Sequence, residues 1–287
     1  MSPFHSYPNT YVSQVHLLVS DLERSKNFYR KILGLHFLKD SERTVILSAN
    51  GADPLVTLEQ PDQAAGHNFR QAGLYHFALL LPSRKDLASM LAHLLKLHYP
   101  LQGGSDHAVS EAVYLADPDG NGIELYRDRP SDKWRWNNGR VFMPTEAISE
   151  DILDELEDGD WKGMPEKTIM GHIHLQVADL KASEDFYCKG LGFDLVAQYD
   201  DQADFISTGG YHHHIGLNVW RSKGSPAGDE ISAGMKHFIL EYPSLKARGE
   251  AVSRLKGMEV PVTEKGAIIT VRDPSNIKIV LHVSKTN

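Results

Sequence analysis

Cysteine is nearly absent from this chain, and long apolar runs and basic clusters are missing as well. The single cysteine, Cys188, excludes an intramolecular disulfide and fits a reducing compartment, so we expect a cytoplasmic protein. The net charge is −8 without any block of lysine and arginine, which argues against a nucleic-acid partner. The opening MSPFHSYPNT lacks the basic and apolar segments of a signal peptide. No stretch approaches the ~20 apolar residues that cross a bilayer, so no membrane partner is predicted.

The chain repeats itself over most of its 287 residues, a length that usually forms two domains. LLVSDLERSKNFYRKILGLHFL, from Leu17, is matched by LQVADLKASEDFYCKGLGFDLV, from Leu175, at a constant offset of 158 residues. A second match joins LYHFALLLPSRKDL, from Leu74, to MKHFILEYPSLKAR, from Met235. The chain therefore consists of four units of related build, and such repeats define the architecture.

Each unit is predicted to fold in the order β-α-β-β-β. In the first, a strand over 11–19 ends at Ser20-Asp21, a good helix N-cap, and an amphipathic helix from Leu22 ends at Gly34, a typical C-cap. The second is predicted to have a strand at 74–81, a helix at 84–96, and strands around 101, at 111–115 and at 122–126. A tight turn, D-P-D-G, precedes its last strand. The third unit spans about 168–220 and the fourth about 234–282.

This organisation divides the chain into three segments. Residues 1–135 hold the first pair of βαβββ units, 136–167 form an acidic linker with a helix, and 168–287 hold the second pair. Within the linker, AISEDILDELEDGDW places Ile148, Ile152, Leu153 and Leu156 on one side of a predicted helix. We interpret it as a solvated acidic linker helix.

Four tandem βαβββ units, with an FY…LGF-type signature at the end of the helix in units one and three, resemble the vicinal oxygen chelate superfamily. Its members include glyoxalase I, type I extradiol dioxygenases, fosfomycin-resistance enzymes and bleomycin-binding proteins. The resemblance implies an α+β fold in which the four units pair into two open barrels, each built from curved sheets that can surround a metal. The repeat is specific for the superfamily and does not select among its functions.

The resemblance also implies where metal ligands lie in each unit, namely on the first strand and on the last strand after the D-P-x-G turn. In units one to four the first-strand positions hold, in order, Gln14, His76, His172 and His237. The last-strand position holds Glu124 in unit two, whereas Val280 in unit four has no carboxylate. Glu124 faces away from its apolar neighbours Ile123 and Leu125, and an inward carboxylate without a cation is costly.

Two ligand sets follow from these positions. Units two and three would supply His76, Glu124 and His172, and two imidazoles with one carboxylate make the facial triad of non-haem Fe(II) oxygenases. Units one and two would instead supply Gln14 and Glu59 together with His76 and Glu124, as in glyoxalase I. Sequential pairing of units three and four would leave that half without a glutamate.

Three landmarks of extradiol dioxygenases, transferred by resemblance, favour the first set. Tyr114 lies ten residues before Glu124, and His107 precedes it. His213 lies in an H-H-I-G string on the predicted last strand of unit three. These landmarks fall on units two and three, so we expect those two units to pair across the linker.

The resemblance then implies an extradiol, catechol 2,3-dioxygenase-like enzyme of aromatic hydrocarbon catabolism. Its cofactor would be Fe(II), with Mn(II), Zn(II) or Ni(II) as alternatives, and its partners a catechol-like aromatic molecule and O₂. The expected metal ligands are His76, Glu124 and His172. His213 would be the general base and later acid, while Tyr114 and His107 would hydrogen-bond the substrate oxygens. Exposed sheet edges leave room for a homo-oligomer.

Two other functions fit the same sequence. A glyoxalase I-like isomerase or lyase would use Gln14, Glu59, His76 and Glu124 around Zn(II) or Ni(II), and would not need His172 or His213. A non-catalytic small-molecule-binding protein would hold no metal, and it requires that no third ligand lies near His76 and Glu124.

Overall fold

The computed structural model describes residues 2–63, 66, 68, 70–156, 161–226 and 232–283. Within these ranges no helix is long and apolar enough to cross a membrane. The first unit contains β1 (Tyr11–Leu18), α1 (Leu22–Asn27), the π-helical turn η1 (Phe28–Ile32), β2 (His36–Asp40), β3 (Thr44–Ser48) and β4 (Val56–Glu59). The second contains β5 (Gly73–Leu80), α2 (Arg84–Lys96), β6 (Leu101–Asp106), β7 (Ser110–Ala116) and β8 (Gly122–Asp128).

The third and fourth units repeat this order. The third contains β12 (Ile169–Gln176), α3 (Leu180–Asp185), the π-helical turn η4 (Phe186–Leu191), β13 (Asp194–Tyr199), β14 (Ala203–Ser207) and β15 (Ile215–Asn218). The fourth contains β16 (Gly234–Tyr242), α4 (Leu245–Gly257), β17 (Val262–Lys265), β18 (Ile268–Arg272) and β19 (Lys278–Val283). The α+β fold of βαβββ units predicted from the repeat is confirmed.

The helices begin where the sequence provides an N-cap. Asp21 and Asp179 each accept a hydrogen bond from the backbone N–H three residues on, and Ser83 and Ser244 do the same for α2 and α4. The predicted helix after Asp21 is not one continuous α-helix, because a π-helical turn replaces its second half at Phe28. Both FY signatures fall on such a turn.

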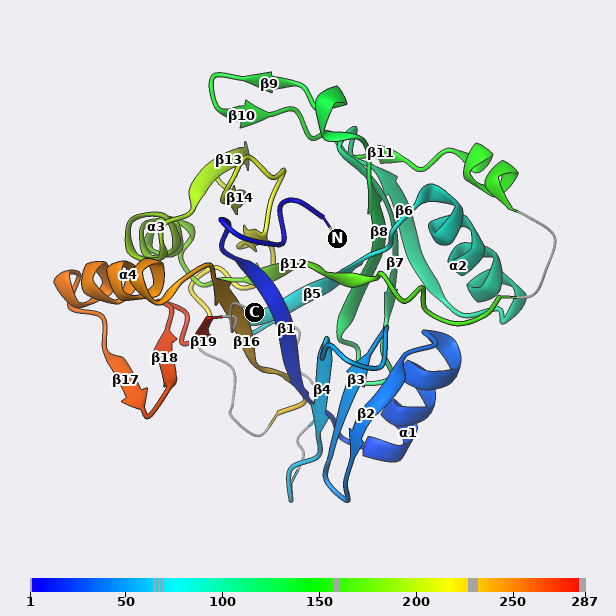
Figure 1. Cartoon of the computed structure of the whole chain (residues 1–287), viewed down its shortest axis with the longest axis horizontal. Coiled ribbons are helices and arrows are strands. Elements are labelled where there is room, and N and C mark those ends of the chain that lie inside the picture. Colours follow the sequence, from blue (N-terminus) through cyan, green and yellow to red (C-terminus); the bar gives the residue numbers. More distant parts are fainter. Residues whose placement is uncertain are drawn as a thin grey trace.

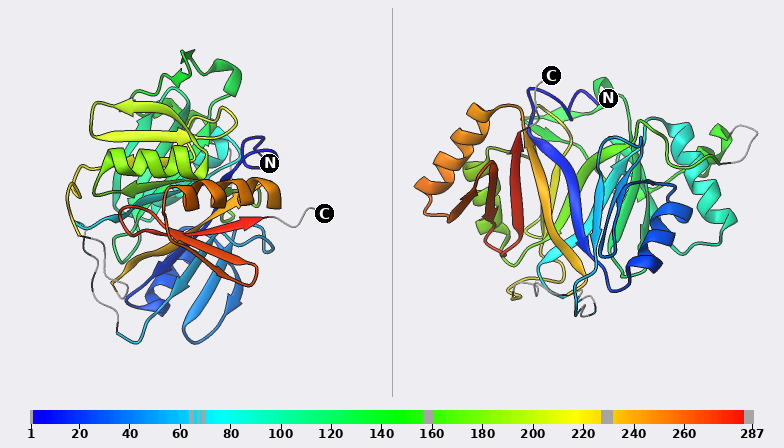
Figure 2. Two further views of the ribbon diagram at one scale, coloured as in Figure 1. Left: turned by 90° about the vertical axis from the view of Figure 1, so that its left-hand side faces the viewer. Right: turned by 60° about the horizontal axis from the view of Figure 1, so that its bottom comes forward.

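The units pair into two sheets in an order that crosses the two halves of the chain. Units four and one form an eight-stranded sheet, β17-β18-β19-β16-β1-β4-β3-β2. Units two and three form a nine-stranded sheet, β11-β6-β7-β8-β5-β12-β15-β14-β13. The joints are the antiparallel pairs β1–β16 and β5–β12, which cross near the centre of Figure 1. Figure 2 shows the curl of the sheets, with the helices on their outer sides.

Buried hydrogen bonds also connect the units in chain order. The Tyr29 hydroxyl donates to Asp117 at 2.9 Å, and the Tyr187 hydroxyl donates to Asp273 at 3.2 Å. Each aspartate begins the D-P turn of the following unit, so the tyrosine of each FY signature connects unit one to unit two and unit three to unit four. The boundaries predicted at 135 and 168 stay a prediction, since the sheets and these contacts join the units differently.

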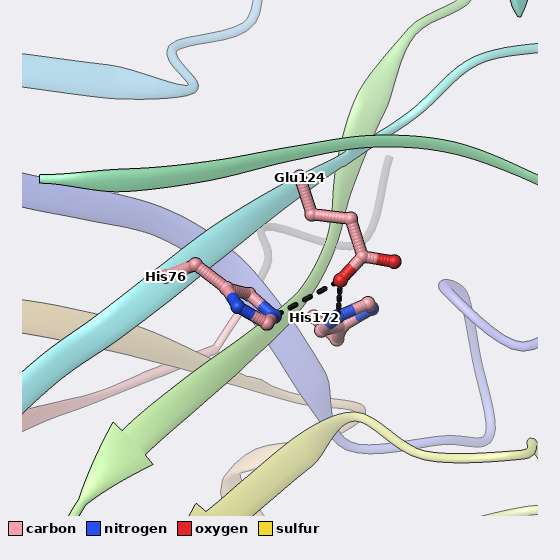
Figure 3. Close-up of side chains that lie close together, drawn as sticks. All are labelled: His76, Glu124 and His172. Carbon is pink, nitrogen blue, oxygen red and sulfur yellow. Dashed lines mark hydrogen bonds and ion pairs between the residues drawn. The ribbon is translucent and has the colours of Figure 1, made fainter. Parts of the chain in front are cut away.

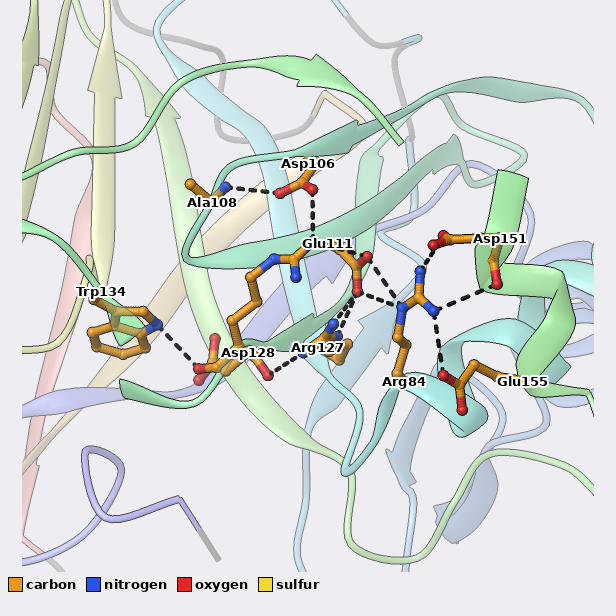
Figure 4. A network of polar contacts seen from close by, with 10 residues as sticks. Arg84, Asp106, Ala108, Glu111, Arg127, Asp128, Trp134, Asp151 and Glu155 are labelled. Carbon is orange, nitrogen blue, oxygen red and sulfur yellow. Dashed lines mark hydrogen bonds and ion pairs between the residues drawn. The ribbon is translucent and has the colours of Figure 1, made fainter. Parts of the chain in front are cut away.

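The segment between the halves is not the acidic α-helix that its pattern predicts. It forms a 3₁₀ turn η2 (Ser131–Lys133), the short strands β9 (Trp136–Asn137), β10 (Arg140–Val141) and β11 (Glu146–Ala147), and a 3₁₀ helix η3 (Glu150–Glu155). Residues 157–160 of the predicted helix lie outside the described ranges. Ile152 is buried, and Arg84 on α2 contacts both Asp151 and Glu155 (Figure 4). This segment is therefore packed against α2 rather than freely solvated.

Candidate metal centre

Three neighbouring strands of the nine-stranded sheet bring His76, Glu124 and His172 together. His76 lies on β5, Glu124 on β8 and His172 on β12, and these strands are adjacent in the order β8-β5-β12. Glu124 and His172 are each in register with Ala78 of the central strand, from opposite sides. Ala78 is small and leaves room for both side chains on this face of the sheet. Figure 3 shows Glu124 and His172 close to each other.

The three side chains converge on one carboxylate oxygen. Glu124 Oε2 lies 2.9 Å from Nε2 of His76 and 3.1 Å from Nε2 of His172. One ligand atom from each residue lies within 4.8 Å of the others, and this is the sole such group of three among the described histidines, cysteines, aspartates and glutamates. The relative exposures are 7%, 3% and 1% for His76, Glu124 and His172, so the group is almost fully shielded from water.

The charge states of this group suit a divalent cation. Burial alone would raise the pKa of Glu124, but the contacts from His172 and His76 lower it well below its usual range, so the carboxylate is ionised. Burial lowers the pKa of His172, with Glu124 opposing this shift, and leaves a neutral imidazole. Nδ1 of His172 has no hydrogen-bond partner among the described residues. Two imidazole nitrogens and an ionised carboxylate are ligands that Fe(II), Mn(II), Zn(II) and Ni(II) accept, and their arrangement leaves coordination positions open.

A glycine makes the close approach of β5 and β8 possible. Gly122, two residues before Glu124, is in register with His76. A Cβ at this position would lie 2.2 Å from the carbonyl oxygen of Tyr75 and 2.9 Å from Cβ of His76. Glycine is therefore needed where the two ligand-bearing strands meet.

The group borders a cavity with a volume of about 650 Å³. His76 and Glu124 lie in its wall, together with the predicted residues His107, Tyr114 and His213. The remainder of the wall includes the aromatic and apolar residues Tyr75, Tyr199, Phe205, Trp220, Leu74, Ile123 and Met143 and the polar residues Gln102, Ser105, Thr145, His174, Gln176 and Arg221. The size is that of a pocket for a small organic molecule, and the aromatic wall suits a planar ring.

Tyr114 and His107 form a hydrogen bond with each other. Nδ1 of His107 lies 2.8 Å from the carbonyl oxygen of Pro144, so it carries the proton and donates. Nε2 then accepts from the Tyr114 hydroxyl, 2.8 Å away. Burial and the nearby charge of Glu124 raise the pKa of Tyr114 well above its usual value, so the phenol stays protonated. The expected hydrogen bonds from this pair to substrate oxygens stay a prediction.

The histidine triplet lies in a loop, not on the strand where the sequence placed it. His212, His213 and His214 precede β15, and all three are buried. The ring of His213 lies 4.1 Å from that of His172, between centroids. Burial lowers the pKa of His213 well below its usual value, and His172 and His212 add to the effect, so its imidazole is neutral. A three-residue histidine run in a strand would have pointed to both faces, whereas a loop can bury all three.

Several residues of the cavity carried no clear sequence signal. Tyr75, Tyr199, Phe205 and Trp220 are single aromatic residues without a motif. His174 has a signal, because it follows His172 by two positions and so lies on the same face of β12. It lines the cavity, and its ring lies 5.0 Å from that of His76.

The alternative ligand set is divided between the two sheets. Gln14 lies on β1 and Glu59 on β4, both in the eight-stranded sheet, whereas His76 and Glu124 are in the other sheet. Glu59 contacts His16 at 2.9 Å and Lys236 at 2.6 Å, so its charge is already balanced. The structure therefore does not bring the four glyoxalase-like residues together.

Two sheets of paired βαβββ units, one carrying a buried His–Glu–His group beside a cavity with aromatic residues in its wall, define a protein class with one candidate metal position among the described residues. The model of the Glyoxalase/Bleomycin resistance protein/Dioxygenase superfamily matches residues 11–125 and 169–281, and the chain belongs to this superfamily. A protein of Bacillus subtilis (strain 168) named catechol-2,3-dioxygenase is 41% identical over 272 residues, which cover 93% of this chain and 95% of that protein. This relationship supports a dioxygenase of the extradiol type.

Solved structures show the same fold at low sequence identity. A Bacillus subtilis structure with a provisional dioxygenase name has a TM-score of 0.67 at 14% identity, covering 96% of this chain and 86% of that one. Glyoxalase I from Zea mays has a TM-score of 0.58 at 16% identity, covering 95% and 92%. These likenesses concern the fold alone, since enzymes of different activity share it.

Proposed function

We propose that this protein is a metal-dependent extradiol dioxygenase that opens the ring of a catechol-like substrate with O₂. The observation that carries the proposal is the convergence of His76, Glu124 and His172 beside a cavity with aromatic walls. The metal would be Fe(II), because two imidazoles and one carboxylate with open positions are typical of non-haem iron oxygenases. The 41% identical relative named catechol-2,3-dioxygenase supports the substrate class.

The chain's own residues would bind the ring and handle its protons. The aromatic wall would stack on the ring, and burial of the site would exclude water from it. His213 is neutral and lines the cavity, so it could take a proton from a substrate hydroxyl and later return it. The bound metal would supply the redox chemistry between the ring and O₂. The hydrogen-bonded Tyr114–His107 pair would bind a substrate oxygen at the cavity wall.

The first test compares two glutamates, each within 3 Å of a histidine nitrogen. Glu124 contacts His76 and His172, and Glu59 contacts His16 in the other sheet. Glu124→Ala should lose stoichiometric iron after anaerobic reconstitution and should keep its fold by circular dichroism, because the remaining sheet is unaffected. Glu59→Ala is the matched control and should keep both. Retention of stoichiometric iron by Glu124→Ala, or its loss by Glu59→Ala, would contradict the ligand assignment.

The second test separates metal binding from proton transfer. His213→Phe should bind iron as the wild type does, because His213 is not among the proposed ligands. Its turnover of catechol, measured as O₂ uptake and as formation of the ring-opened semialdehyde, should fall by about 10²- to 10⁴-fold, the range that a general base contributes. Unchanged turnover would remove His213 as the acid–base residue. Iron binding without any ring opening across simple catechols by the wild type would overturn the proposed activity.

A further inference from the structure

A chain of hydrogen bonds runs from the predicted base away from the metal position. Nδ1 of His213 lies 2.8 Å from Nδ1 of His212. Nε2 of His212 lies 2.8 Å from Oδ1 of Asp128. His212 has no exposed surface, so water does not replace either partner. The three side chains form a carboxylate–imidazole–imidazole series that ends at the cavity wall.

Strand β8 supplies both ends of the site. Glu124 and Asp128 are four residues apart on this strand and therefore point to the same face, with Tyr126 between them. The ring of Tyr126 packs 4.9 Å from that of His172, and its hydroxyl lies 2.7 Å from that of Tyr211. The Tyr211 hydroxyl donates to Oδ1 of Asp128 at 3.1 Å. Strand β8 thus carries the proposed metal ligand Glu124 and, four residues further on, Asp128, the carboxylate at the far end of the hydrogen-bonded series.

For a neutral His212, these contacts define which nitrogen of His213 carries a proton. The Asp128 carboxylate accepts a hydrogen bond from Tyr211 and has no proton of its own to donate. Nε2 of His212 must therefore be the donor in its contact with Asp128. A neutral imidazole that donates from Nε2 has no proton on Nδ1, so that Nδ1 can only accept. The Nδ1–Nδ1 contact then requires a proton on Nδ1 of His213, which leaves Nε2 of His213 as the bare nitrogen.

We infer that Asp128 and His212 are positioning residues that hold His213 in the Nδ1–H tautomer, with a basic Nε2 presented to the cavity. This inference rests on the proposed function for its purpose, because a base needs its lone pair on the substrate side. It deepens that function by naming two residues that touch neither metal nor substrate. Without them His213 could turn or exchange tautomers, and the wrong tautomer would present an N–H to the substrate hydroxyl.

The decisive measurement is the nitrogen NMR spectrum of metal-free protein labelled with ¹⁵N-histidine. Long-range ¹H–¹⁵N correlations distinguish a protonated from a bare ring nitrogen, and the His213 signals are assigned by their loss in His213→Phe. We expect a protonated Nδ1 and a bare Nε2 for His213 in the wild type. A protonated Nε2 with a bare Nδ1, or protons on both nitrogens, would overturn the inference without any variant having to fold.

Variants test the cause of the tautomer. His212→Phe removes the acceptor, and Asp128→Ala removes the carboxylate that orients it, so both should give a mixture of the two His213 tautomers. Tyr211→Phe is the matched control, because it removes one hydroxyl from Asp128 but leaves the His212 contact, and it should keep the single tautomer. A single Nδ1–H tautomer in folded His212→Phe or Asp128→Ala would also contradict the assignment.

Kinetics separate this inference from the proposed activity. In the iron-loaded enzyme, Asp128→Ala should lower kcat by about 10- to 100-fold with little change in KM, since substrate contacts remain. A wild type with the expected tautomer and no ring-opening activity would defeat the proposed function and leave the positioning intact. An active wild type with a protonated Nε2 on His213 would defeat the positioning and leave the function.

Discussion

Replacing Gly122 by alanine tests the packing that brings two proposed ligands together. The added Cβ would lie 2.2 Å from the carbonyl oxygen of Tyr75, on the strand that carries His76. Real contacts of this type do not fall below 3.0 Å, so β5 and β8 must separate by about 1 Å. The atom in the way is backbone, which cannot move aside by a change of rotamer.

The structure predicts two consequences of this substitution. Overpacking of a buried site costs about 1–3 kcal/mol, so the free energy of unfolding of Gly122→Ala should fall by that amount. A metal site must keep its ligands within about 0.5 Å of their productive positions, so the affinity for Fe(II) should fall by at least about 10-fold. The two effects have one cause, namely displacement of His76 relative to Glu124.

The assay combines urea unfolding with anaerobic Fe(II) titration against a competing chelator. Metal affinity is read without urea, where both proteins are folded. Gly249→Ala provides the matched control, because Gly249 lies inside α4 with nothing within 4 Å of an added Cβ. Alanine there should stabilise the protein by about 0.5–1 kcal/mol through helix propensity and should not affect metal binding. Wild-type stability and metal affinity in Gly122→Ala would refute the reasoning.

Two further predictions concern buried carboxylates outside the metal position. Burial raises the pKa of Asp273 from 3.8 to about 6, so the wild type loses stability as the pH rises through this range, by about 3 kcal/mol in full. In urea unfolding, the free energy of unfolding of Asp273→Asn minus that of the wild type should increase by about 2 kcal/mol between pH 4 and pH 8. A difference that does not change with pH would contradict this expectation. Glu111→Gln removes the 1% exposed carboxylate that Arg84, Arg127 and Arg129 share. Arg84 keeps Asp151 and Glu155, and Arg129 keeps Asp106, so the loss falls mainly on Arg127 and should cost about 1–3 kcal/mol in the same assay. The exposed Asp151→Asn should change little.

Local signals predicted the elements well because the physics behind them is local. The helix from Arg84 to Lys96 has the predicted bounds. The last strand of unit two begins at Gly122, directly after its predicted turn. The π-helical turn at Phe28 was missed, since the same residues fit an ordinary α-helix. The prediction of an acidic linker helix was wrong because residues 150–155 form a 3₁₀ helix in contact with α2, and the sequence pattern does not reveal that contact.

The site was partly predictable because repeats align positions that the fold places alike. His76, Glu124 and His172 followed from ligand counting over the four units, and the structure brings them into one group. Which units pair could not follow from the repeat itself, because all four have the same strand pattern. The contact between His212 and Asp128 joins residues 84 positions apart and depends on a loop conformation, so no spacing rule indicates it.

The crossed pairing of the units has a consequence for biosynthesis. As a nascent chain leaves the ribosome, β1 emerges first but has no neighbour on one side until β16, which begins at Gly234, has been made. The sheet that holds the metal position ends at Asn218 and can close earlier. During synthesis, the edge of β1 therefore stays unpaired until β16 has been made. Chaperone binding or aggregation would act at this unpaired edge.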